Sequence, residues 1–266
     1  MSDDPFAQMK QRQREMWASF APTAAFTTTV AAHLVAFARI APGEAVLDVG
    51  TGTGVVAITA ARAGAVATGM DLTPPLLAVA RENGRIAGLG SVEWIEGDAE
   101  RLPFPDRRFD VVLSQFGHMF APRPDIAVGE MHRVLKPGGR IAFATWPPEH
   151  FVGRLFAFIG QYTPSAPGAA PPAQWGNPAT ITERLGERFA PPFFARGVMH
   201  IPALSLPHFR EFMERSVGPM QKLVESLSAE PERLEAVRAG FEALAAPYFA
   251  GNAIHQDYLL TLASAR

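Results

Sequence analysis

The feature that most constrains this chain is a glycine-rich loop directly after a short apolar run. Val46-Leu47-Asp48-Val49 reads as a buried strand, Gly50-Thr51-Gly52-Thr53-Gly54 follows it, and Val55 to Arg62 has the pattern of a helix. Glycine lets the backbone turn sharply and lets a ligand come into contact with the main chain. A helix N-terminus at this point aims free N–H groups and a partial positive charge at that ligand. The loop therefore predicts a site for a nucleotide-type cofactor.

Composition excludes several classes of function. The 266 residues are 48% hydrophobic and 19% charged, with a net charge of −2, so the chain can bury a large core and has no basic footprint for nucleic acid. It contains no cysteine, which excludes disulfides and thiolate metal sites. The polar start of the chain does not resemble a signal peptide, and no apolar stretch is long enough to span a membrane. We expect a cytoplasmic protein.

Strand-like and helix-like segments alternate through the first half of the chain. A helical preface at 1–41 comes first, and strands and helices then follow in turn, which predicts parallel βαβ units in a doubly wound sheet. Residues 1–145 are expected to form these helices and the cofactor-binding core. After the first strand at Val46, the expected strands are Val66–Met70, Val92–Glu96, Phe109–Leu113 and Arg140–Thr145, and the expected helices are Pro74–Ala87 and Ile126–Leu135.

The alternation stops at Trp146-Pro147-Pro148. Eleven prolines lie between Pro147 and Pro207, yet aromatic residues keep recurring, which favours an ordered cap or lid over a linker. Residues 146–253 are predicted to be this insertion together with the region of a sixth strand, within the same domain. Residues 254–266 would supply the final strand. Helices are expected at Phe151–Tyr162, Leu206–Arg215 and Pro231–Leu244.

The glycine spacing bears on which cofactor is bound. A dinucleotide-binding loop reads G-x-G-x-x-G, whereas the third glycine here comes one residue early. This spacing favours a nucleoside ligand other than NAD, although it leaves NAD open. A phosphate-binding P-loop is not supported, because no Gly-Lys-Ser/Thr follows.

Two carboxylates follow the next strands. Asp71 ends the second strand about 20 residues after the loop, where an acidic side chain accepts both hydroxyls of a ribose; a solvated strand end is the alternative. Asp98, in Glu96-Gly97-Asp98-Ala99, is placed to accept from the exocyclic amine of a base, with Gly97 allowing close approach. Its alternative role is to cap a turn.

Five motifs in order carry a family resemblance. They are the loop at 46–54, Met70-Asp71-Leu72, Gly97-Asp98-Ala99 with Leu102-Pro103-Phe104, Phe109-Asp110-Val111-Val112, and Leu135-Lys136-Pro137-Gly138-Gly139. Over residues 17–145 the chain resembles the class I S-adenosylmethionine-dependent methyltransferases, nearest to the ubiquinone/menaquinone-biosynthesis type. The resemblance implies an α/β fold with a doubly wound, mostly parallel, seven-stranded Rossmann-like sheet and a helical, Pro-rich cap after strand 5.

The resemblance also implies how S-adenosylmethionine is held, with S-adenosylhomocysteine as product. The glycine loop would hold the methionine part with Asp48, Asp71 the ribose, and Asp98 the adenine amino group. Trp17 and Phe20 are candidates to close over the cofactor from the N-terminal side, with helical packing as the equal alternative. The expected cofactor-binding residues are Phe20, Asp48, Gly50, Thr51, Gly52, Asp71, Leu72, Gly97, Asp98, Ala99, Glu100, Ser114, Gln115 and Phe116. No metal ligand is expected.

Methyl transfer depends on alignment and exclusion of water, and it needs a base only if the acceptor must lose a proton. His118, just past the fourth strand, is the candidate catalytic base, with packing against the cofactor or a local hydrogen bond as the favoured alternative. His150 and His255 have weaker claims.

The aromatic, uncharged cap suits a small hydrophobic acceptor. The partner expected is thus a small molecule, with no nucleic acid and no membrane span, in a monomer or homodimer. The competing hypotheses are an NAD(P)-dependent oxidoreductase and a cofactor-binding protein without catalysis.

Overall fold

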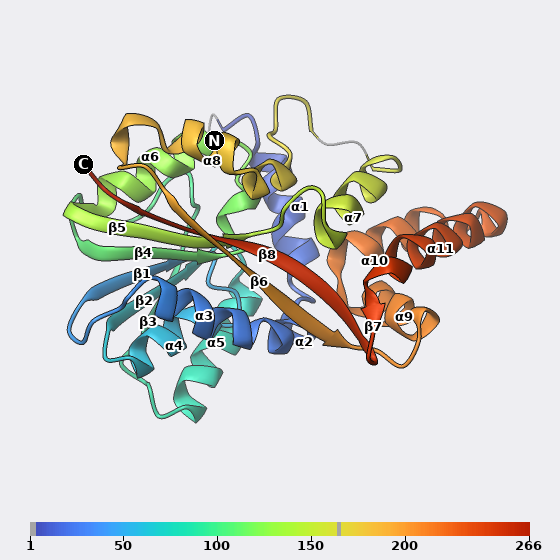
Figure 1. Ribbon diagram of the computed structural model, residues 1–266, viewed down its shortest axis with the longest axis horizontal. Coiled ribbons are helices and arrows are strands. Elements are labelled where there is room, and N and C mark those ends of the chain that lie inside the picture. Colours follow the sequence, from blue (N-terminus) through green and yellow to red (C-terminus); the bar gives the residue numbers. More distant parts are fainter. Residues whose placement is uncertain (1–3, 164–165) are drawn as a thin grey trace.

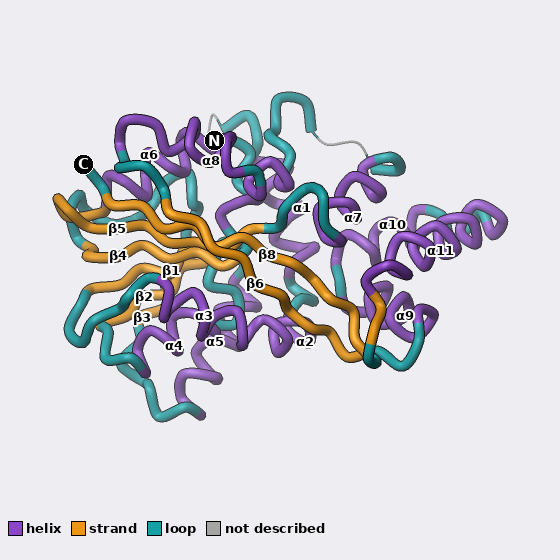
Figure 2. The backbone as a smooth tube through the Cα atoms, viewed as in Figure 1, coloured by secondary structure: helices purple, strands orange, loops and turns teal. Residues whose placement is uncertain are grey.

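A twisted central sheet organises the protein in the computed structural model, which describes residues 4–163 and 166–266 (Figures 1 and 2). The strand order is β3-β2-β1-β4-β5-β8-β6, and β7 pairs with β8 beside this path. Neighbours from β3 to β5 are parallel, whereas β8 runs antiparallel to both β5 and β6. The strands are β1 (Ala45–Val49), β2 (Val66–Asp71), β3 (Glu93–Glu96), β4 (Phe109–Gln115), β5 (Leu135–Thr145), β6 (Phe193–Pro202), β7 (Phe249–Ala250) and β8 (Ala253–Ser264).

The predicted doubly wound, mostly parallel α/β fold is confirmed, but the sheet has eight strands where seven were expected. The additional strand is the two-residue β7, which forms a hairpin with β8. Gly251 and Asn252 join the two strands, and both have a positive φ, of 58° and 57°. A two-residue turn with this backbone matches the twist of a hairpin, so β8 begins by pairing with the segment just before it.

Helices cover both faces of the sheet, with α3, α4 and α5 along one side in Figure 1 and α6 and α8 along the other. Many helices begin with proline in the first turn, where a missing N–H costs no helical hydrogen bond. The helices of the core are α1 (Ala7–Trp17), α2 (Ala21–Ala24), α3 (Thr28–Phe37), α4 (Val55–Arg62), α5 (Pro74–Ile86) and α6 (Pro124–Val134), with short 3-10 turns η1 (Ala25–Thr27) and η2 (His118–Phe120).

The segment expected to be a cap enters the structure in two pieces, one before β6 and one after it. The first piece holds α7 (Phe151–Gly160), η3 (Pro172–Gly176), α8 (Pro178–Leu185) and η4 (Gly186–Arg188). The second holds α9 (Leu206–Ser216), α10 (Gly218–Ser226), α11 (Pro231–Ala245) and η5 (Ala246–Tyr248). In Figure 1 the helices α7, α9, α10 and α11 gather at one end of the sheet, around the far end of the β6–β8 pair. The division into residue segments 1–145, 146–253 and 254–266 remains a prediction.

Strand β5 is longer than its sequence pattern indicates. It begins at Leu135, five residues before the expected start at Arg140, and the register shifts after Leu135 pairs with Phe109. Gly138, with a φ of 72°, lies within the irregular stretch. The Lys136-Pro137-Gly138-Gly139 motif is therefore a bulge inside the strand and not a turn before it.

Among the helices of residues 4–163 and 166–266, none is by itself long and apolar enough to cross a membrane. Only the pair formed by α1 and the helical run 21–37, bent by 72°, meets the length and composition of a span together.

The glycine loop packs against a single indole ring. A Cβ on Gly54 would lie 2.6 Å from Cη2 of Trp94, and a Cβ on Gly69 would lie 2.6 Å from Cζ3 of the same ring. Gly84 of α5 is also in contact range of this ring. The third glycine of the loop thus makes room for Trp94 of β3, which ties β1, β2 and α5 together.

We predict that Gly69→Ala lowers the free energy of unfolding by about 1–3 kcal/mol, because the new methyl group overlaps Trp94 in a packed site. Chemical denaturation measures this change. Gly129→Ala on α6 is the control, since its Cβ would meet open space, and it should be neutral or mildly stabilising. Equal stability of Gly69→Ala and wild type would contradict the packing assigned to Trp94.

Candidate active site

A cavity of about 230 Å³ opens where the strand order reverses, between the carboxyl ends of β1 and β4. This is the place where open α/β sheets bind ligands. Twelve of the fourteen residues expected to bind the cofactor line it: Phe20, Asp48, Gly50, Thr51, Gly52, Asp71, Leu72, Gly97, Asp98, Ala99, Gln115 and Phe116. The other two, Glu100 and Ser114, do not.

The glycine loop has the backbone that the sequence requires. Gly50, Gly52 and Gly54 all have positive φ, of 70°, 55° and 86°, which side chains with a Cβ rarely adopt. The N–H groups of Gly50 and Thr51 both donate to the carbonyl of Met70, at 2.8 and 2.9 Å, and fix the loop to β2. A Cβ on Gly52 would meet nothing within 4 Å, so the loop leaves space beside its middle glycine.

Asp71 lies at the end of β2, beside the loop, as predicted. Its Oδ2 accepts from the N–H of Gly52 at 2.8 Å, and its Oδ1 accepts from the N–H of Thr73 at 2.8 Å. Burial raises the pKa of this carboxyl group although these hydrogen bonds act in the opposite direction. The carboxylate is therefore held in one orientation at the cavity wall.

Asp48 is buried beneath the loop with one oxygen unpaired. Its Oδ2 accepts from the Thr51 hydroxyl at 2.6 Å and from the N–H of Ala57 at 3.2 Å. Its Oδ1 has no hydrogen-bond partner in the described part of the chain. Burial raises the pKa of Asp48 to about 7, and the neighbouring Asp71 adds to the rise. A cationic group in the cavity would offset this desolvation.

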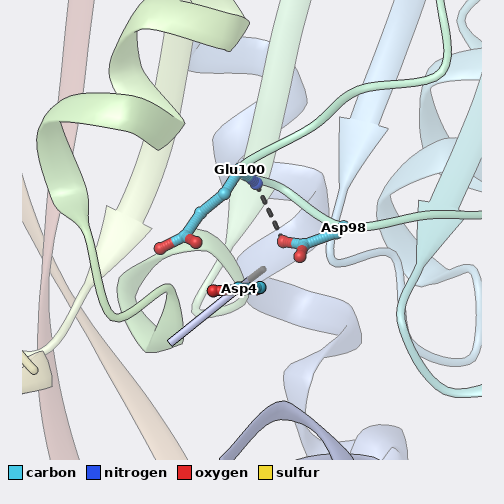
Figure 3. A group of neighbouring side chains, drawn as sticks. All are labelled: Asp4, Asp98 and Glu100. Atoms are coloured by element: carbon cyan, nitrogen blue, oxygen red, sulfur yellow. Dashed lines mark hydrogen bonds between the residues drawn. The ribbon is translucent and has the colours of Figure 1, made fainter. Parts of the chain in front are cut away.

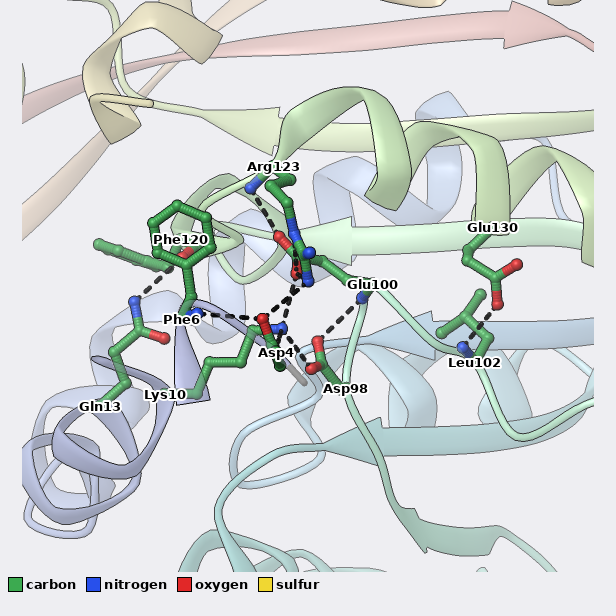
Figure 4. A network of polar contacts seen from close by, with 10 residues as sticks. All are labelled: Asp4, Phe6, Lys10, Gln13, Asp98, Glu100, Leu102, Phe120, Arg123 and Glu130. Atoms are coloured by element: carbon green, nitrogen blue, oxygen red, sulfur yellow. Dashed lines mark hydrogen bonds and ion pairs between the residues drawn. The ribbon is translucent and has the colours of Figure 1, made fainter. Parts of the chain in front are cut away.

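On the predicted adenine side, Asp98 lines the cavity and Glu100 does not, and the cofactor-binding role of both remains a prediction. Asp98 Oδ2 is 2.6 Å from the Lys10 ammonium, and its Oδ1 accepts from the N–H of Glu100 at 2.9 Å (Figure 4). The Glu100 carboxylate pairs with Lys10 at 2.6 Å and with Arg123. The hydrogen bond from the Glu100 N–H to Asp98 thus belongs to a turn, and the Glu100 side chain is part of a cluster of ion pairs.

We name this group the N-terminal ion cluster: Asp4, Lys10, Asp98, Glu100 and Arg123. Oxygens of its three carboxylates lie within 4.8 Å of one another, an arrangement that a metal ion could use (Figure 3). The Lys10 ammonium nevertheless lies 2.6–2.7 Å from an oxygen of each, and Arg123 contacts two of them (Figure 4). The cluster therefore docks α1 onto the loop after β3.

Ser114 does not line the cavity, and its hydroxyl bonds to the backbone. It donates to the carbonyl of Val49 at 2.6 Å and accepts from the N–H of His118 at 3.0 Å. This links the end of β1 to the turn after β4. Phe116 follows with a positive φ of 59°, and its ring stacks on Trp146 at 3.8 Å between centroids. A phenylalanine whose backbone is in the left-handed region is strained, and this conformation persists only where the surrounding packing holds it.

His118 lies at the cavity but its ring is enclosed. The ring is 4.6 Å from the rings of both Phe143 and Trp175, and neither nitrogen has a partner in residues 4–163 or 166–266. Burial, together with the nearby Arg184, lowers its pKa to about 3. This geometry supports the packing role, because a base needs a nitrogen that reaches its proton. His150 and His255 do not line the cavity.

The N-terminal and cap elements enclose the rest of the cavity. Trp17 and Phe20 both line it, and Trp17 also packs on Phe120 at 4.8 Å between centroids. Several lining residues were not predicted: Lys10, Gln13, Trp146, Val152, Leu155, Phe156, Ile159, Met199, Ile201, Met213, Val217, Pro219 and Gln256. The periodic apolar positions of α7 are the sequence signal that could have found Val152, Leu155, Phe156 and Ile159.

Comparison with known proteins decides the family. The family described as "Methyltransferase domain" matches residues 47–143, from β1 into β5. The chain belongs to the class I S-adenosylmethionine-dependent methyltransferases. This confirms the resemblance drawn from the five sequence motifs.

Relatives of this methyltransferase extend the match to the cap. An uncharacterized protein of Mycobacterium tuberculosis is 34% identical over 253 residues, which cover 93% of this chain and 92% of that protein. Demethylmenaquinone methyltransferase of Thermus thermophilus is 43% identical over 105 residues, which cover 39% of this chain and 47% of the enzyme. The YcgJ protein of Bacillus subtilis has the same fold, with a TM-score of 0.60 at 20% identity, covering 90% of this chain and 99% of that structure.

The methyltransferase should lose stability as pH rises from about 4 to 7, because Asp48 keeps its proton when folded and releases it when unfolded. The slope from this group is at most about 1.4 kcal/mol per pH unit. Asp48→Asn should make this slope smaller. Part of the dependence of stability on pH should remain, because the pKa of Asp71 is also raised. Urea unfolding at pH 5 and pH 7 measures the slope, with the exposed Asp106→Asn as control. An unchanged slope in Asp48→Asn would show that Asp48 is ionised throughout.

Lys10→Met should release α1, since it leaves the carboxylates of the N-terminal ion cluster with Arg123 alone. We expect amide hydrogen exchange in residues 4–17 to accelerate at least tenfold, with a stability loss of about 1–3 kcal/mol. Lys222→Met removes an exposed pair with Glu225 and should change neither. Undiminished protection of α1 in Lys10→Met would mean that its apolar contacts suffice.

Proposed function

We propose that this methyltransferase transfers a methyl group from S-adenosylmethionine to a small, largely apolar acceptor. The observation that carries the proposal is one cavity with two chemically different ends. Its loop end holds the acidic residues Asp48, Asp71 and Asp98, and its cap end is lined by uncharged side chains from α7, β6, α9 and β8. A cofactor with a charged tail and an apolar acceptor would meet where these ends join.

The residues at the loop end fit this cofactor. Asp48 has an unpaired carboxylate oxygen under the loop, suited to an ammonium group, and Gly52 leaves open space at the backbone. Asp71 is fixed by two backbone N–H groups and would accept the ribose hydroxyls. Asp98 would accept from the adenine amino group, and Lys10 competes with that amino group for the Asp98 carboxylate.

When bound, the cofactor supplies an electrophilic methyl group. The protein's own contribution is alignment and exclusion of water. Trp17 and Phe20 close the N-terminal side, while the apolar faces of α7 and β6 enclose the acceptor side. None of the cavity-lining residues in the described part of the cap is ionisable, so we infer that proton removal, where an acceptor requires it, does not rest on these side chains.

S-adenosylhomocysteine should raise the melting temperature by about 5 °C or more at a hundredfold excess over its Kd, because it binds only the folded state. NADH in the same assay should have no effect. Asp71→Ala should abolish the shift, and Asp71→Asn should reduce it while keeping the side-chain shape. Asp106→Ala, an exposed carboxylate, should retain it. Stabilisation by NADH and not by S-adenosylhomocysteine would reject the proposal in favour of an oxidoreductase.

A further inference from the structure

The wall of the cavity opposite the glycine loop is built by a two-stranded extension of the sheet. Residues 259–264 of β8 pair with β5, whereas residues 253–258 continue past the end of β5 with only β6 and β7 beside them. Figure 1 shows β6 and β8 running out together to the cap helices. Within this extension Gln256 pairs with Met199, and both line the cavity.

Gln256 is a polar residue in the lining of this cavity. The residue is only 4% exposed, and its side chain makes no hydrogen bond to other residues in the described ranges. Neither amide atom of Gln256 is both fully buried and without a hydrogen-bond partner. Since the amide makes no hydrogen bond, it must supply part of the surface that this residue still exposes. Because this amide is open to the cavity, a ligand with a matching polar group can form a hydrogen bond with it.

A second carboxamide reaches the same cavity from the other side. Gln115, at the end of β4, donates through Nε2 to the carbonyl of Thr27 at 3.1 Å, so the amide has one orientation. Its Oε1 is buried without a partner in the structure as described. The Gln115 acceptor oxygen is therefore closed off, and of these two amides that of Gln256 is the one open to a ligand.

Charge is confined to the loop end. The ionisable lining residues are Lys10, Asp48, Asp71, Asp98 and His118, and none of them comes from the cap or from β6 and β8. Met199 pairs with Gln256 across the two strands, and Ile201 and Met213 also line the cavity. An ionised acceptor would lose its hydration there without a counter-charge, at a cost of several kcal/mol.

We propose that Gln256 determines acceptor specificity by hydrogen-bonding one neutral oxygen group, a hydroxyl or carbonyl, on an otherwise apolar molecule. This rests on the proposed function and specifies its substrate class. The amide orients the acceptor through that oxygen, and the surrounding apolar side chains reject carboxylates and ammonium groups.

The test compares three ligands with one bicyclic frame, 2-naphthol, naphthalene and 2-naphthoate, by equilibrium dialysis against the protein loaded with S-adenosylhomocysteine. Wild type should bind 2-naphthol at least tenfold tighter than the other two. Gln256→Met keeps the side-chain volume without the amide, and it should bind 2-naphthol and naphthalene equally. Thr261→Val, on the same strand but outside the cavity, should retain the wild-type preference.

Each outcome has a distinct meaning. Tighter binding of 2-naphthoate, or no preference among the ligands in wild type, overturns the inference without recourse to any variant. A preference retained by Gln256→Met also overturns it, provided that the variant binds S-adenosylhomocysteine normally. Failure of wild type to bind S-adenosylhomocysteine at all overturns the proposed function, and this inference with it.

Discussion

Two strand ends that touch through their backbones determine the rest of this structure. A Cβ on Gly50, after β1, would lie 2.8 Å from the Cα of Gly117, after β4, and a Cβ on Gly117 would lie 2.8 Å from that of Gly50. Only glycine at both positions permits this approach. It brings the loop that is expected to hold the cofactor against the 114–120 turn, so that the two ends of the cavity become one space.

The core of the fold was predictable because its signals are local and repeated. Glycines with positive φ, prolines in first turns and apolar runs agree with the tertiary structure at each step from β1 to β4. The site was predictable for residues that directly end a strand, such as Asp71. Spacing places a backbone, whereas partners decide where a side chain points. Glu100 pairs with Arg123 and Lys10, and the Ser114 hydroxyl donates to the Val49 carbonyl, so neither side chain lines the cavity.

The second half was harder to predict because its signals are weak or misleading. Strand β6 contains Gly197, which leaves room for the ring of Tyr258 on β8, and its exposed positions interrupt the apolar pattern. The start of helix α8 did have a sequence signal, which is an asparagine followed by a proline. Asn177 caps the helix by accepting from the N–H groups of Ala179 and Thr180, and Pro178 is the first helical residue. Cavity residues such as Met199 and Gln256 come together only through pairing over a long stretch of chain, which no local pattern encodes.

Strand β8 has two roles, since one part completes the sheet beside β5 and the other forms the cavity wall with β6. During synthesis the glycine loop and its carboxylates emerge long before this strand does. A ribosome-bound chain would therefore acquire the glycine-loop end of the cavity first and would lack the β6–β8 wall until β8 inserts. The side chain that we propose to select the acceptor, Gln256, is thus among the last to reach its place as the chain folds.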